Sequence, residues 1–542
     1  MSHAVRRGRS TPAQLYLDGV LESILEVKKE MDRSKISVAE VIFYCMNRYR
    51  SNVFLINGLT NESFTNEQIL KMSVPLARAL IARGMKEKTA MLILRNHELM
   101  AAVYYGVIFA GVIPFMIDPN CTIYELSHFM DLICPSIVFC EQNREANVTK
   151  TVNDSNNDKR NIIVVDDGTR FQQFFAGFSD NLDTFRIIGV DVNSTVIMLP
   201  TSGSTGLPKA AMLSNTGLVA QLPTLWAYHT QFPRPTNIAM LISTAQWMTH
   251  TNLMTTCPVY QITLLMTPTP TIDSVLKMIR RNKPTWALLG PAFANSLSTA
   301  AASEDLASFQ TVLITGSQPG PNTMKALKEK LSKRVHLCNG YGMTETHGFI
   351  SIPDQKTPFE STGMIANIFN FQFQDENGKE VGVNENGELM LRSKLCILKG
   401  YYKNVKAYKE CVTDDNWLKT GDVFYQNEDG LMFFVERKKF WFKYSNYHIS
   451  PEELEAVIGT VPGVQECAVC ETPNGPAAGV VRRPDCNTTE QEIHSIVNST
   501  LSDCKRLRGG VVFVTSLPHT HSGKLHRADC RHLINKLLGN QL

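Results

Sequence analysis

A run of hydroxyl, glycine and lysine residues follows an apolar segment near the middle of the chain. Thr201–Lys209 reads Thr-Ser-Gly-Ser-Thr-Gly-Leu-Pro-Lys and comes directly after Thr195–Met198, which is typical of a buried strand. The N–H groups of such a loop can surround an anion, and Lys209 adds a full positive charge. This is not a Walker A loop, because Pro208 precedes the lysine and opposes entry into a helix. The loop predicts a phosphate cradle, with an ordinary surface loop as the equal alternative.

Three further stretches carry groups that suit a nucleotide. Tyr341–Glu345 offers an aromatic ring for a base, a hydroxyl for a phosphate and a carboxylate for a divalent cation. Trp417–Asp422 ends in a carboxylate that could accept both hydroxyls of a ribose. His521–Lys524 places a lysine on a glycine turn, where it could move in and out of a site built by another domain. Taken singly, each stretch has a plain structural explanation: a packed tyrosine, a turn aspartate or a solvated lysine.

Short apolar runs that alternate with helical stretches must position these motifs. We expect buried strands at Met91–Leu94, Val112–Ile117, Ser136–Cys140, Asn161–Val165, Thr195–Met198, Ile262–Met266, Trp286–Leu289 and Thr311–Ile314. Such a pattern indicates parallel sheets covered by helices, whose ligand loops lie at the carboxyl ends of the strands. We therefore expect loops there at Thr201–Lys209, Thr315–Pro319 and Asn339–Glu345. Two helical patterns precede the strands, and the first has an apolar stripe of Leu17, Leu21, Ile24 and Val27.

The pattern of the sequence changes from about Phe371. Short alternating strands with turns such as Asp375–Gly378 and Asn427–Gly430 predict a small antiparallel sheet or barrel. After Arg437 the density of charge rises, and Pro451–Glu455 opens a helix with its acids in the first turn. We predict an α/β protein with a domain at residues 1–436, made of helix-covered, mainly parallel sheets and a small β-barrel. A smaller, mobile α+β domain follows at residues 437–542.

Composition narrows the class of protein. A chain of 542 residues with 43% hydrophobic and 19% charged residues is too long for one core and is ordinary for a globular protein. A net charge of +3 gives no field that would indicate nucleic acid. Thirteen single cysteines suit reduced thiols inside a cell, and Cys467 and Cys470 are interpreted as structural. The charge-free run Leu99–Ile117 is interrupted by glycine and proline, so we expect a buried helix and strand rather than a membrane span.

In this order and at these separations, the four motifs resemble those of the adenylate-forming superfamily, in its branch of insect acyl-CoA synthetases and firefly luciferases. The resemblance covers nearly the whole chain. It is most specific at Gly430–Lys439, Lys443–Glu455 and Lys505–Val514. It implies that a carboxylate attacks the α-phosphate of Mg-ATP to give an acyl adenylate and pyrophosphate. The C-terminal domain then rotates, and the thiol of CoA displaces AMP.

The resemblance also assigns roles to residues of the nucleotide site. The pyrophosphate end of ATP would be held by Thr201, Ser202, Gly203, Ser204, Thr205, Gly206 and Lys209. The adenine would be enclosed by Gly316, Ser317, Gln318, Pro319, Asn339, Gly340, Tyr341 and Gly342. Asp422 would bind the ribose, with Arg437 nearby.

The catalytic and metal-binding roles follow from the same resemblance. Thr344 would meet the α-phosphate, while Glu345 and Thr205 would hold Mg²⁺. Lys524 would bridge the acyl carboxylate and the phosphate in the first step. Lys443 would enter the site in the second step, and a lysine suits both places because its charge sits on a long stem.

Two regions depart from the pattern of the family. Ala245–Met248 stands where luciferases and many relatives have a His-His-Gly-Phe-like segment. His250 is near in sequence, but a shift of two residues along a helix places it on another face. The missing histidine argues against light emission. We expect Gln246, Trp247, Gly342 and Met343 to line the acyl substrate, with a core tryptophan as the plainer explanation of Trp247. Glu436 and Asn446–His448 replace the usual hinge residues. These changes concern the thioester step more than adenylation, so absent CoA ligation stays an alternative.

The leading hypothesis is an ATP- and Mg²⁺-dependent acid:CoA ligase for an apolar carboxylic acid, in particular a fatty acid. The apolar specificity rests on the resemblance and on Ala287, Leu288, Leu289, Ala292 and Phe293, which would equally suit a sheet core. The alternatives are a luciferase-like oxygenase of an acyl adenylate and a non-catalytic protein that binds a nucleotide or acyl-CoA. We expect ATP, CoA and a small acid as partners, with no nucleic acid, transmembrane segment or carrier domain. We expect an intracellular, cytoplasmic protein; without a terminal Ser-Lys-Leu, a peroxisomal location is only an alternative.

Overall fold

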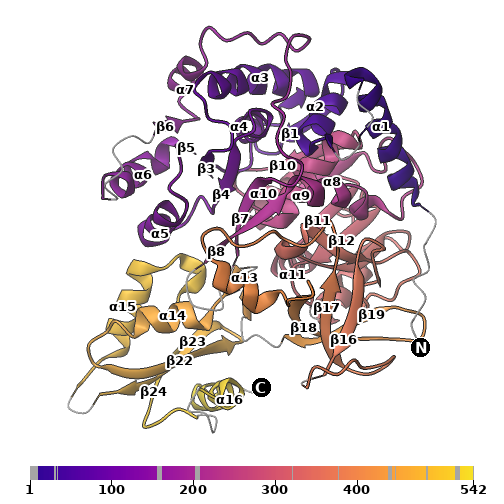
Figure 1. Ribbon diagram of the computed structural model, residues 1–542. Helices are drawn as coiled ribbons and strands as arrows, with labels where there is room; N and C mark the ends of the chain where they lie inside the picture. The colour runs from indigo at the N-terminus through magenta and orange to yellow at the C-terminus, as the bar shows by residue number, and fades with distance from the viewer. Residues whose placement is uncertain are drawn as a thin grey trace. The chain divides into compact units, whose positions relative to one another are not determined.

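The chain forms two compact units in the computed structural model (Figure 1). The structure describes residues 10–29, 32, 35–154, 161–201, 208–319, 321–375, 377–437, 442–445, 447–483, 486–518 and 525–540. The first unit consists of Met1–Pro119, Ile133–Pro200 and Ala210–Glu436. The second consists of Arg437–Leu542 together with Asn120–Leu132 and Thr201–Lys209.

A six-stranded sheet carries the strands expected in the first part of the chain. Its order is β6-β5-β3-β4-β7-β8. The strands are β3 (Thr89–Ile93), β4 (Ile113–Met116), β5 (Ile137–Cys140), β6 (Asn161–Val164), β7 (Thr195–Thr201) and β8 (Lys209–Ser214). The pairs β3–β4, β3–β5, β4–β7 and β5–β6 are parallel, as expected for strands that alternate with helices.

A nine-stranded sheet is the largest layer of the first unit. Its order is β15-β14-β13-β12-β11-β9-β10-β1-β2. The strands are β1 (Val53–Asn57), β2 (Ser63–Thr65), β9 (Ile238–Leu241), β10 (Thr263–Met266), β11 (Trp286–Leu289), β12 (Thr311–Thr315), β13 (His336–Met343), β14 (Gly348–Ile352) and β15 (Met364–Ile365). The six strands from β13 to β1 in this order pair in parallel, and β2, β14 and β15 add antiparallel edges.

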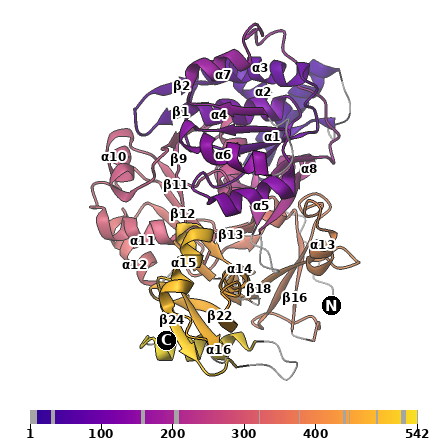
Figure 2. The same cartoon turned by 90° about the vertical axis from the view of Figure 1, so that its left-hand side faces the viewer.

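Helices cover both sheets and fill the space between them. They are α1 (Pro12–Lys28), α2 (Val38–Arg48), α3 (Asn66–Ala82), α4 (Glu98–Phe109), α6 (Gln142–Asp154), α7 (Gly168–Phe174), α8 (Asn215–Gln221), α9 (Met248–Val259), α10 (Ile272–Asn282), α11 (Pro291–Ala300) and α12 (Pro321–Lys330), with short 3₁₀ turns at Thr224–Trp226 and Thr344–Thr346. The helix α5 (Ile123–Ile133) belongs to the second unit except for its last residue. One core cluster joins α4 and α9 to residues of both sheets, such as Leu92 and Leu264. In a second cluster, α10–α12 pack along one side of the nine-stranded sheet (Figure 2). The helix expected in Leu99–Ile117 is α4, which is buried from Met100 to Phe109.

The first helix confirms most of its expected apolar stripe. Thr11 caps the N-terminus of α1 by accepting a hydrogen bond from the backbone N–H of Gln14. Leu17, Leu21 and Ile24 are buried, but Val27 is 74% exposed. The prediction was therefore wrong for Val27, which lies in the last turn of α1.

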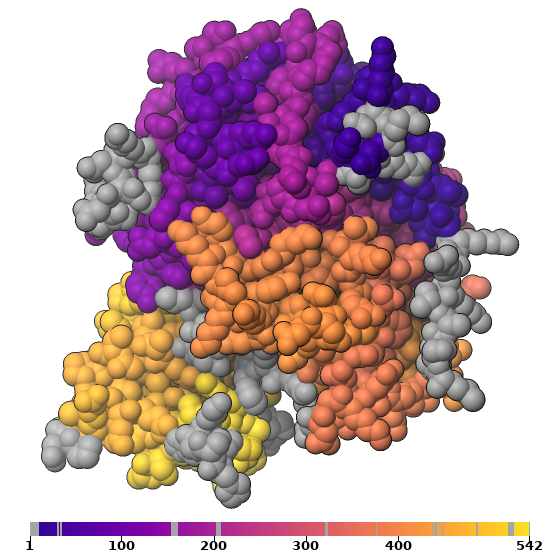
Figure 3. Space-filling model, viewed as in Figure 1, coloured from indigo at the N-terminus to yellow at the C-terminus, as the bar shows by residue number. Residues whose placement is uncertain are grey.

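A four-stranded sheet, in which β16–β17 and β17–β18 pair in antiparallel register, completes the first unit. It consists of β16 (Asn370–Gln374), β17 (Gly387–Arg392), β18 (Leu418–Gln426) and β19 (Met432–Arg437), in that order. A core cluster joins this sheet to α13 (Val405–Cys411), and the orange surface of these elements lies directly below the magenta surface of the first unit (Figure 3). The expected change to short antiparallel strands is confirmed.

The second unit has a three-stranded sheet of its own. The sheet consists of β22 (Val464–Thr472), β23 (Gly475–Arg482) and β24 (Gly510–Val514). The unit also contains the hairpin of β20 (Phe442–Tyr444) and β21 (Tyr447–Ile449), the helices α14 (Pro451–Ile458), α15 (Glu490–Thr500) and α16 (Arg527–Leu537), and a 3₁₀ turn at Asp503–Lys505. Ser450 caps α14, which begins at Pro451 as expected. Cys467 and Cys470 lie buried on β22. In the part of the chain that the structure describes, no helix is long and apolar enough to cross a membrane.

Candidate functional site

The strand β13 carries five of the predicted nucleotide- and substrate-binding residues. Asn339 to Met343 lie on this strand, and Thr344 and Glu345 follow in a 3₁₀ turn. We expected Asn339–Glu345 as a loop, and this was wrong. Up to Gly340 the strand pairs with β12 in parallel, and beyond it Tyr341 and Gly342 pair with β14 in antiparallel register. The added partner strand therefore keeps this stretch extended.

A glycine at position 342 is required by the close approach of β13 to β14. A Cβ atom at Gly342 would lie 2.6 Å from the carbonyl oxygen of Gly348 and 2.9 Å from the Cα of Phe349. These are backbone atoms, so the clash could be relieved only by separating the two strands. The glycine between Tyr341 and Met343 is thus explained by packing, independently of any ligand.

Tyr341 and Asp422 are brought together by two different sheets of the first unit. The hydroxyl of Tyr341 donates a hydrogen bond to Oδ2 of Asp422 over 2.7 Å. Asp422 lies on β18 and is 2% exposed, and the ring of Tyr341 packs on Phe424 with a centroid distance of 4.7 Å. A residue predicted to stack on adenine and a residue predicted to bind ribose are therefore direct neighbours.

Glu345 is held by a residue that the sequence did not single out. The hydroxyl of Tyr401 donates a hydrogen bond to Oε1 of Glu345 over 2.8 Å, and the N–H of Leu398 donates to the carbonyl oxygen of Glu345 over 2.9 Å. Tyr401 is 8% exposed. Burial and the neighbouring Glu345 carboxylate raise the pKa of Tyr401, so its hydroxyl stays protonated and acts as a donor. The separation of 56 residues left no local signal for this pair.

The predicted adenine loop lies at the end of β12 and is tied to β13. Gly316 adopts a φ of 100°, a conformation that favours glycine, directly after Thr315 at the end of the strand. The Nδ2 of Asn339 donates to Oε1 of Gln318 over 3.0 Å, and the Oγ1 of Thr315 donates to the carbonyl oxygen of Gly340 over 2.8 Å. Ser317 and Pro319 belong to the same loop. The expected position at the carboxyl end of a parallel strand is confirmed for this loop.

Gln246 joins the carboxyl ends of the two large sheets. Its Nε2 donates to Oδ2 of Asp118 over 3.0 Å; Gln246 follows β9 and Asp118 follows β4. Gln246 is 8% exposed, and its Oε1 has no hydrogen-bond partner among the described residues. Trp247 is half-buried and precedes the first residue of α9. Asp118 was not predicted, since a lone aspartate after a strand carries no distinctive pattern.

His250 is part of the core rather than a replacement for the missing histidines. It lies in α9 with no exposed surface, and neither ring nitrogen has a partner in the described part of the chain. Burial lowers the pKa of this imidazole to about 3, so it is neutral at ordinary pH. Of the apolar residues proposed to contact the acid, Ala287, Leu288 and Leu289 are buried sheet core, whereas Ala292 and Phe293 are half-buried at the start of α11.

The second unit contains the ends of the predicted phosphate loop. Thr201 is the last residue of β7, and Lys209 is the first residue of β8. The chain therefore continues from the loop into a strand, which agrees with the exclusion of a Walker A loop. A ring nitrogen of His128, a residue not predicted, lies 2.9 Å from the carbonyl oxygen of Pro208. Ser202, Gly203, Ser204, Thr205 and Gly206 lie outside the described residues.

Two further predicted residues lie on strands. Arg437 is the last residue of β19. Lys443 lies on β20 and faces His448 across the hairpin in antiparallel register. Lys524 lies outside the described residues. The roles assigned to these three residues stay predictions.

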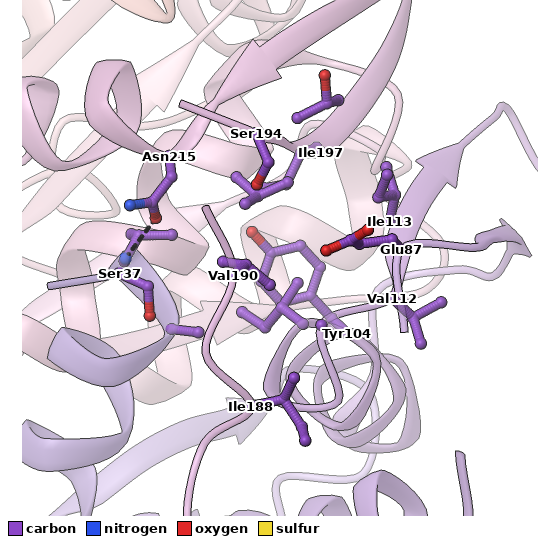
Figure 4. A pocket seen from close by; sticks show the side chains of 16 residues that line it. Ser37, Glu87, Tyr104, Val112, Ile113, Ile188, Val190, Ser194, Ile197 and Asn215 are labelled. Carbon is purple, nitrogen blue, oxygen red and sulfur yellow. Dashed lines mark hydrogen bonds between the residues drawn. The ribbon is translucent and has the colours of Figure 1, made fainter. Parts of the chain in front are cut away.

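A separate pocket lies in the first unit (Figure 4). Its lining is mostly aliphatic, with the Tyr104 hydroxyl in the middle and Glu87 at one side. The Oδ1 of Asn215 accepts a hydrogen bond from the N–H of Val38 over 2.7 Å at its edge. None of the predicted site residues lines this pocket. The side chain of Asn215 thus connects the start of α8 to the start of α2.

The donor groups suit magnesium that arrives with a nucleotide better than a metal bound by protein alone. Among the described residues, no three His, Cys, Asp or Glu side chains converge on one point. Glu345 supplies one half-buried carboxylate beside Thr344. Mg²⁺ is commonly held by one or two carboxylates, water and the phosphates of a substrate. Glu345 can therefore supply the protein carboxylate of such a site.

Comparison with known proteins identifies the family. A family model described as AMP-binding enzyme matches residues 43–402, and one described as AMP-binding enzyme C-terminal domain matches residues 453–524. The chain belongs to the AMP-binding enzyme family. The family belongs to the adenylate-forming superfamily, which includes luciferase-like members. The predicted superfamily and fold class are therefore confirmed. CoA ligases of this superfamily use ATP, Mg²⁺ and CoA.

Individual relatives of the family align over almost their whole length. The chain is 29% identical to a luciferin 4-monooxygenase of Photuris pensylvanica, over 92% of this chain and 96% of the relative. It is 28% identical to 4-coumarate–CoA ligase 1 of Petroselinum crispum, over 88% of this chain and 90% of the relative. The solved structure of an amide bond synthetase from Marinactinospora thermotolerans has a TM-score of 0.79 at 20% identity, covering 92% of this chain and 99% of that one. This structural likeness shows the shared fold.

Proposed function

We propose that the protein is an ATP-dependent acid:CoA ligase that activates an apolar carboxylic acid, with fatty acids as the leading class. In the first step a carboxylate oxygen attacks the α-phosphorus of ATP, the bond to pyrophosphate breaks, and an acyl adenylate forms. In the second step the sulfur of CoA attacks the acyl carbon, the carbon–oxygen bond to AMP breaks, and the thiol proton passes to solvent.

The observation that most supports this proposal is the clustering of nucleotide-type groups around β13. Gln318 of the predicted adenine loop accepts a hydrogen bond from Asn339, and Asp422 accepts one from Tyr341. Glu345 follows two residues after Met343. An aromatic ring, a ribose-type carboxylate and a metal-type carboxylate thus occur along one strand and its neighbours. In such a site, fixed groups hold the substrate in a reactive orientation and stabilise charge on the phosphates.

The adenylation step needs positive charge around the α-phosphate and the leaving pyrophosphate. We propose that Ser202–Gly206, Thr201 and Lys209 bind the pyrophosphate end, and that Thr344 binds the α-phosphate. Bound Mg²⁺ would supply further neutralisation of phosphate charge, held by Glu345 and Thr205. Lys524 would orient the acyl carboxylate toward the phosphorus. Arg437 would lie near the ribose held by Asp422.

The thioester step would use a different lysine, Lys443. A lysine is suited to this exchange because its flexible stem carries a full charge over several ångströms. The replacements at Glu436 and Asn446–His448 fall in the same part of the chain. We propose that these replacements change the rate of the thioester step without abolishing the step.

We propose that the acid is bound beside Gln246, Trp247, Gly342 and Met343. The half-buried Ala292 and Phe293 add apolar surface at the start of α11. An apolar acid agrees with a relative named 4-coumarate–CoA ligase. The absence of histidine at Ala245–Met248 favours a ligase over a light-emitting oxygenase.

Acid-dependent exchange of labelled pyrophosphate into ATP tests the adenylation step. The purified protein is given ATP, Mg²⁺ and a panel of fatty and aryl acids, one at a time. We expect exchange with at least one apolar acid and a loss of about a hundredfold or more in Lys524→Ala, because a positioned charge in the transition state is removed. Exchange with none of the acids, together with binding of ATP or acyl-CoA, would instead support the non-catalytic alternative.

A further inference from the structure

The segment around Tyr401 is anchored on both sides of the tyrosine. The N–H of Tyr402 donates to the carbonyl oxygen of Ala210 over 2.8 Å, and the N–H of Met212 donates to the carbonyl oxygen of Gly400 over 3.0 Å. Ala211 and Tyr401 form an antiparallel bridge between these bonds. The backbone of Tyr401 is thus fixed to β8, the strand that follows the predicted phosphate loop.

The side chain of Tyr401 is fixed as well. It belongs to the core cluster of the four-stranded sheet, together with Ala407, Cys411 and Leu418. The Sγ of Cys411 lies 3.9 Å from the Tyr401 hydroxyl. A tyrosine ring has few rotatable bonds, so a buried ring with a bonded backbone places its hydroxyl precisely. The hydroxyl is therefore a rigid donor.

The acceptor of this donor is one oxygen of a carboxylate. Glu345 has two carboxylate oxygens, and the hydrogen bond from Tyr401 engages Oε1. The backbone of Glu345 is held in addition by the N–H of Leu398, three residues before Tyr401. The segment Leu398–Tyr401 therefore restrains both the main chain and the side chain of Glu345. A carboxylate restrained in this way loses less freedom when it binds a metal ion.

We infer that Tyr401 is a positioning residue for Glu345, and that its hydroxyl holds Oε1 so that Oε2 can bind the Mg²⁺ of Mg-ATP. This inference rests on the proposed function, in which Glu345 binds magnesium. In this inference Tyr401 acts through Glu345 and does not itself contact the nucleotide or the metal. Groups that orient a metal ligand commonly affect metal affinity by 10- to 100-fold when they are lost.

The test measures nucleotide binding, which needs neither an acid substrate nor turnover. The affinity of ATP for the full chain is determined by calorimetry with excess Mg²⁺ and again with EDTA, for the original protein, Tyr401→Phe and Glu345→Gln. Tyr402→Phe is the matched control, because it removes the hydroxyl of the adjacent tyrosine. We expect Mg²⁺ to strengthen ATP binding in the original protein and in Tyr402→Phe. In Tyr401→Phe this strengthening falls about tenfold, while the affinity in EDTA stays within twofold.

A double variant separates positioning from a loss of structure. If Tyr401 acts through Glu345, adding Tyr401→Phe to Glu345→Gln changes the Mg²⁺-dependent affinity by less than twofold. A Mg²⁺ effect on ATP affinity that is the same in Tyr401→Phe and in the original protein would overturn the inference. So would an equal loss of affinity with and without Mg²⁺, which would indicate a purely structural role. Failure of the proposed ligase function would appear separately, as ATP binding without acid-dependent pyrophosphate exchange.

Discussion

The hydroxyl of Tyr341 donates to Oδ2 of Asp422 over 2.7 Å, and the aspartate is 98% removed from solvent in this arrangement. A buried carboxylate is stable only when hydrogen bonds satisfy it. The pair therefore links the packing of two sheets to the proposed ribose site. It also orients the carboxylate of Asp422, which the proposed function assigns to the ribose.

Tyr341→Phe tests this link. The variant leaves a buried carboxylate without this donor, so we expect the free energy of unfolding to fall by about 1.5–3 kcal/mol. We also expect the Kd of ATP to rise about tenfold, because Asp422 is no longer oriented. Chemical denaturation followed by fluorescence measures the first effect, and calorimetry measures the second. Tyr425→Phe, on the strand of Asp422, is the control and should change both by little; equal behaviour of the two variants would contradict the link.

Gly342→Ala tests the close approach of β13 and β14. A Cβ at this position would lie 2.6 Å from the carbonyl oxygen of Gly348, so the strands have to separate. We expect a loss of stability of about 1–3 kcal/mol, the usual cost of overpacking, together with weaker ATP binding. Gly168→Ala serves as the control, because its Cβ would meet nothing within 4 Å. A thermal midpoint of Gly342→Ala equal to that of the control would refute the packing argument.

His250→Met tests the buried imidazole through its pH dependence. Burial lowers the pKa of His250 to about 3, below the value near 6.5 expected in the unfolded chain. As the pH falls below 6.5, the unfolded chain takes up a proton that the folded protein does not, so stability is lost progressively between pH 6.5 and 3. Proton uptake by this residue in the unfolded chain should lower the free energy of unfolding by about 2 kcal/mol between pH 7 and pH 5.

The measurement for His250 is the denaturation midpoint of both proteins at pH 7, 6 and 5. His250→Met should lose less stability over this range than the original protein, by about the amount given above. Parallel curves for the two proteins would mean that His250 takes up a proton in the folded state.

Gln246→Ala tests whether the Gln246–Asp118 pair borders the acid. The hydrogen bond of 3.0 Å fixes the side chain at the carboxyl ends of both large sheets. We expect the KM of the acid to change at least about fivefold, while the KM of ATP changes less than twofold, because only one substrate would contact this region. Steady-state kinetics with the best acid of the panel gives both constants. A change in the KM of ATP alone would place Gln246 at the nucleotide instead.

Much of the fold could be predicted because buried parallel strands are continuous apolar runs. Trp286–Leu289 and Thr311–Ile314 pair in the expected sheet, and the loop after Thr315 lies at its carboxyl end. Motif spacing likewise indicated Tyr341 and Asp422. What could not be predicted depends on contacts between distant segments. The partners Tyr401 and Asp118 carry no local pattern, the extended course of Asn339–Met343 depends on β14, and the exposure of Val27 depends on where the core ends.

The most direct test of the ligase proposal is the detection of both products by mass spectrometry. The protein is incubated with ATP, Mg²⁺, CoA and a mixture of fatty and aryl acids, alongside Lys524→Ala and Lys443→Ala. We expect AMP and one or more acyl-CoA species from the original protein, and little acyl-CoA from either variant. We also expect Lys443→Ala to keep the acid-dependent exchange of pyrophosphate, whereas Lys524→Ala loses it. Pyrophosphate release without any thioester, in the original protein and with every acid, would contradict the ligase proposal.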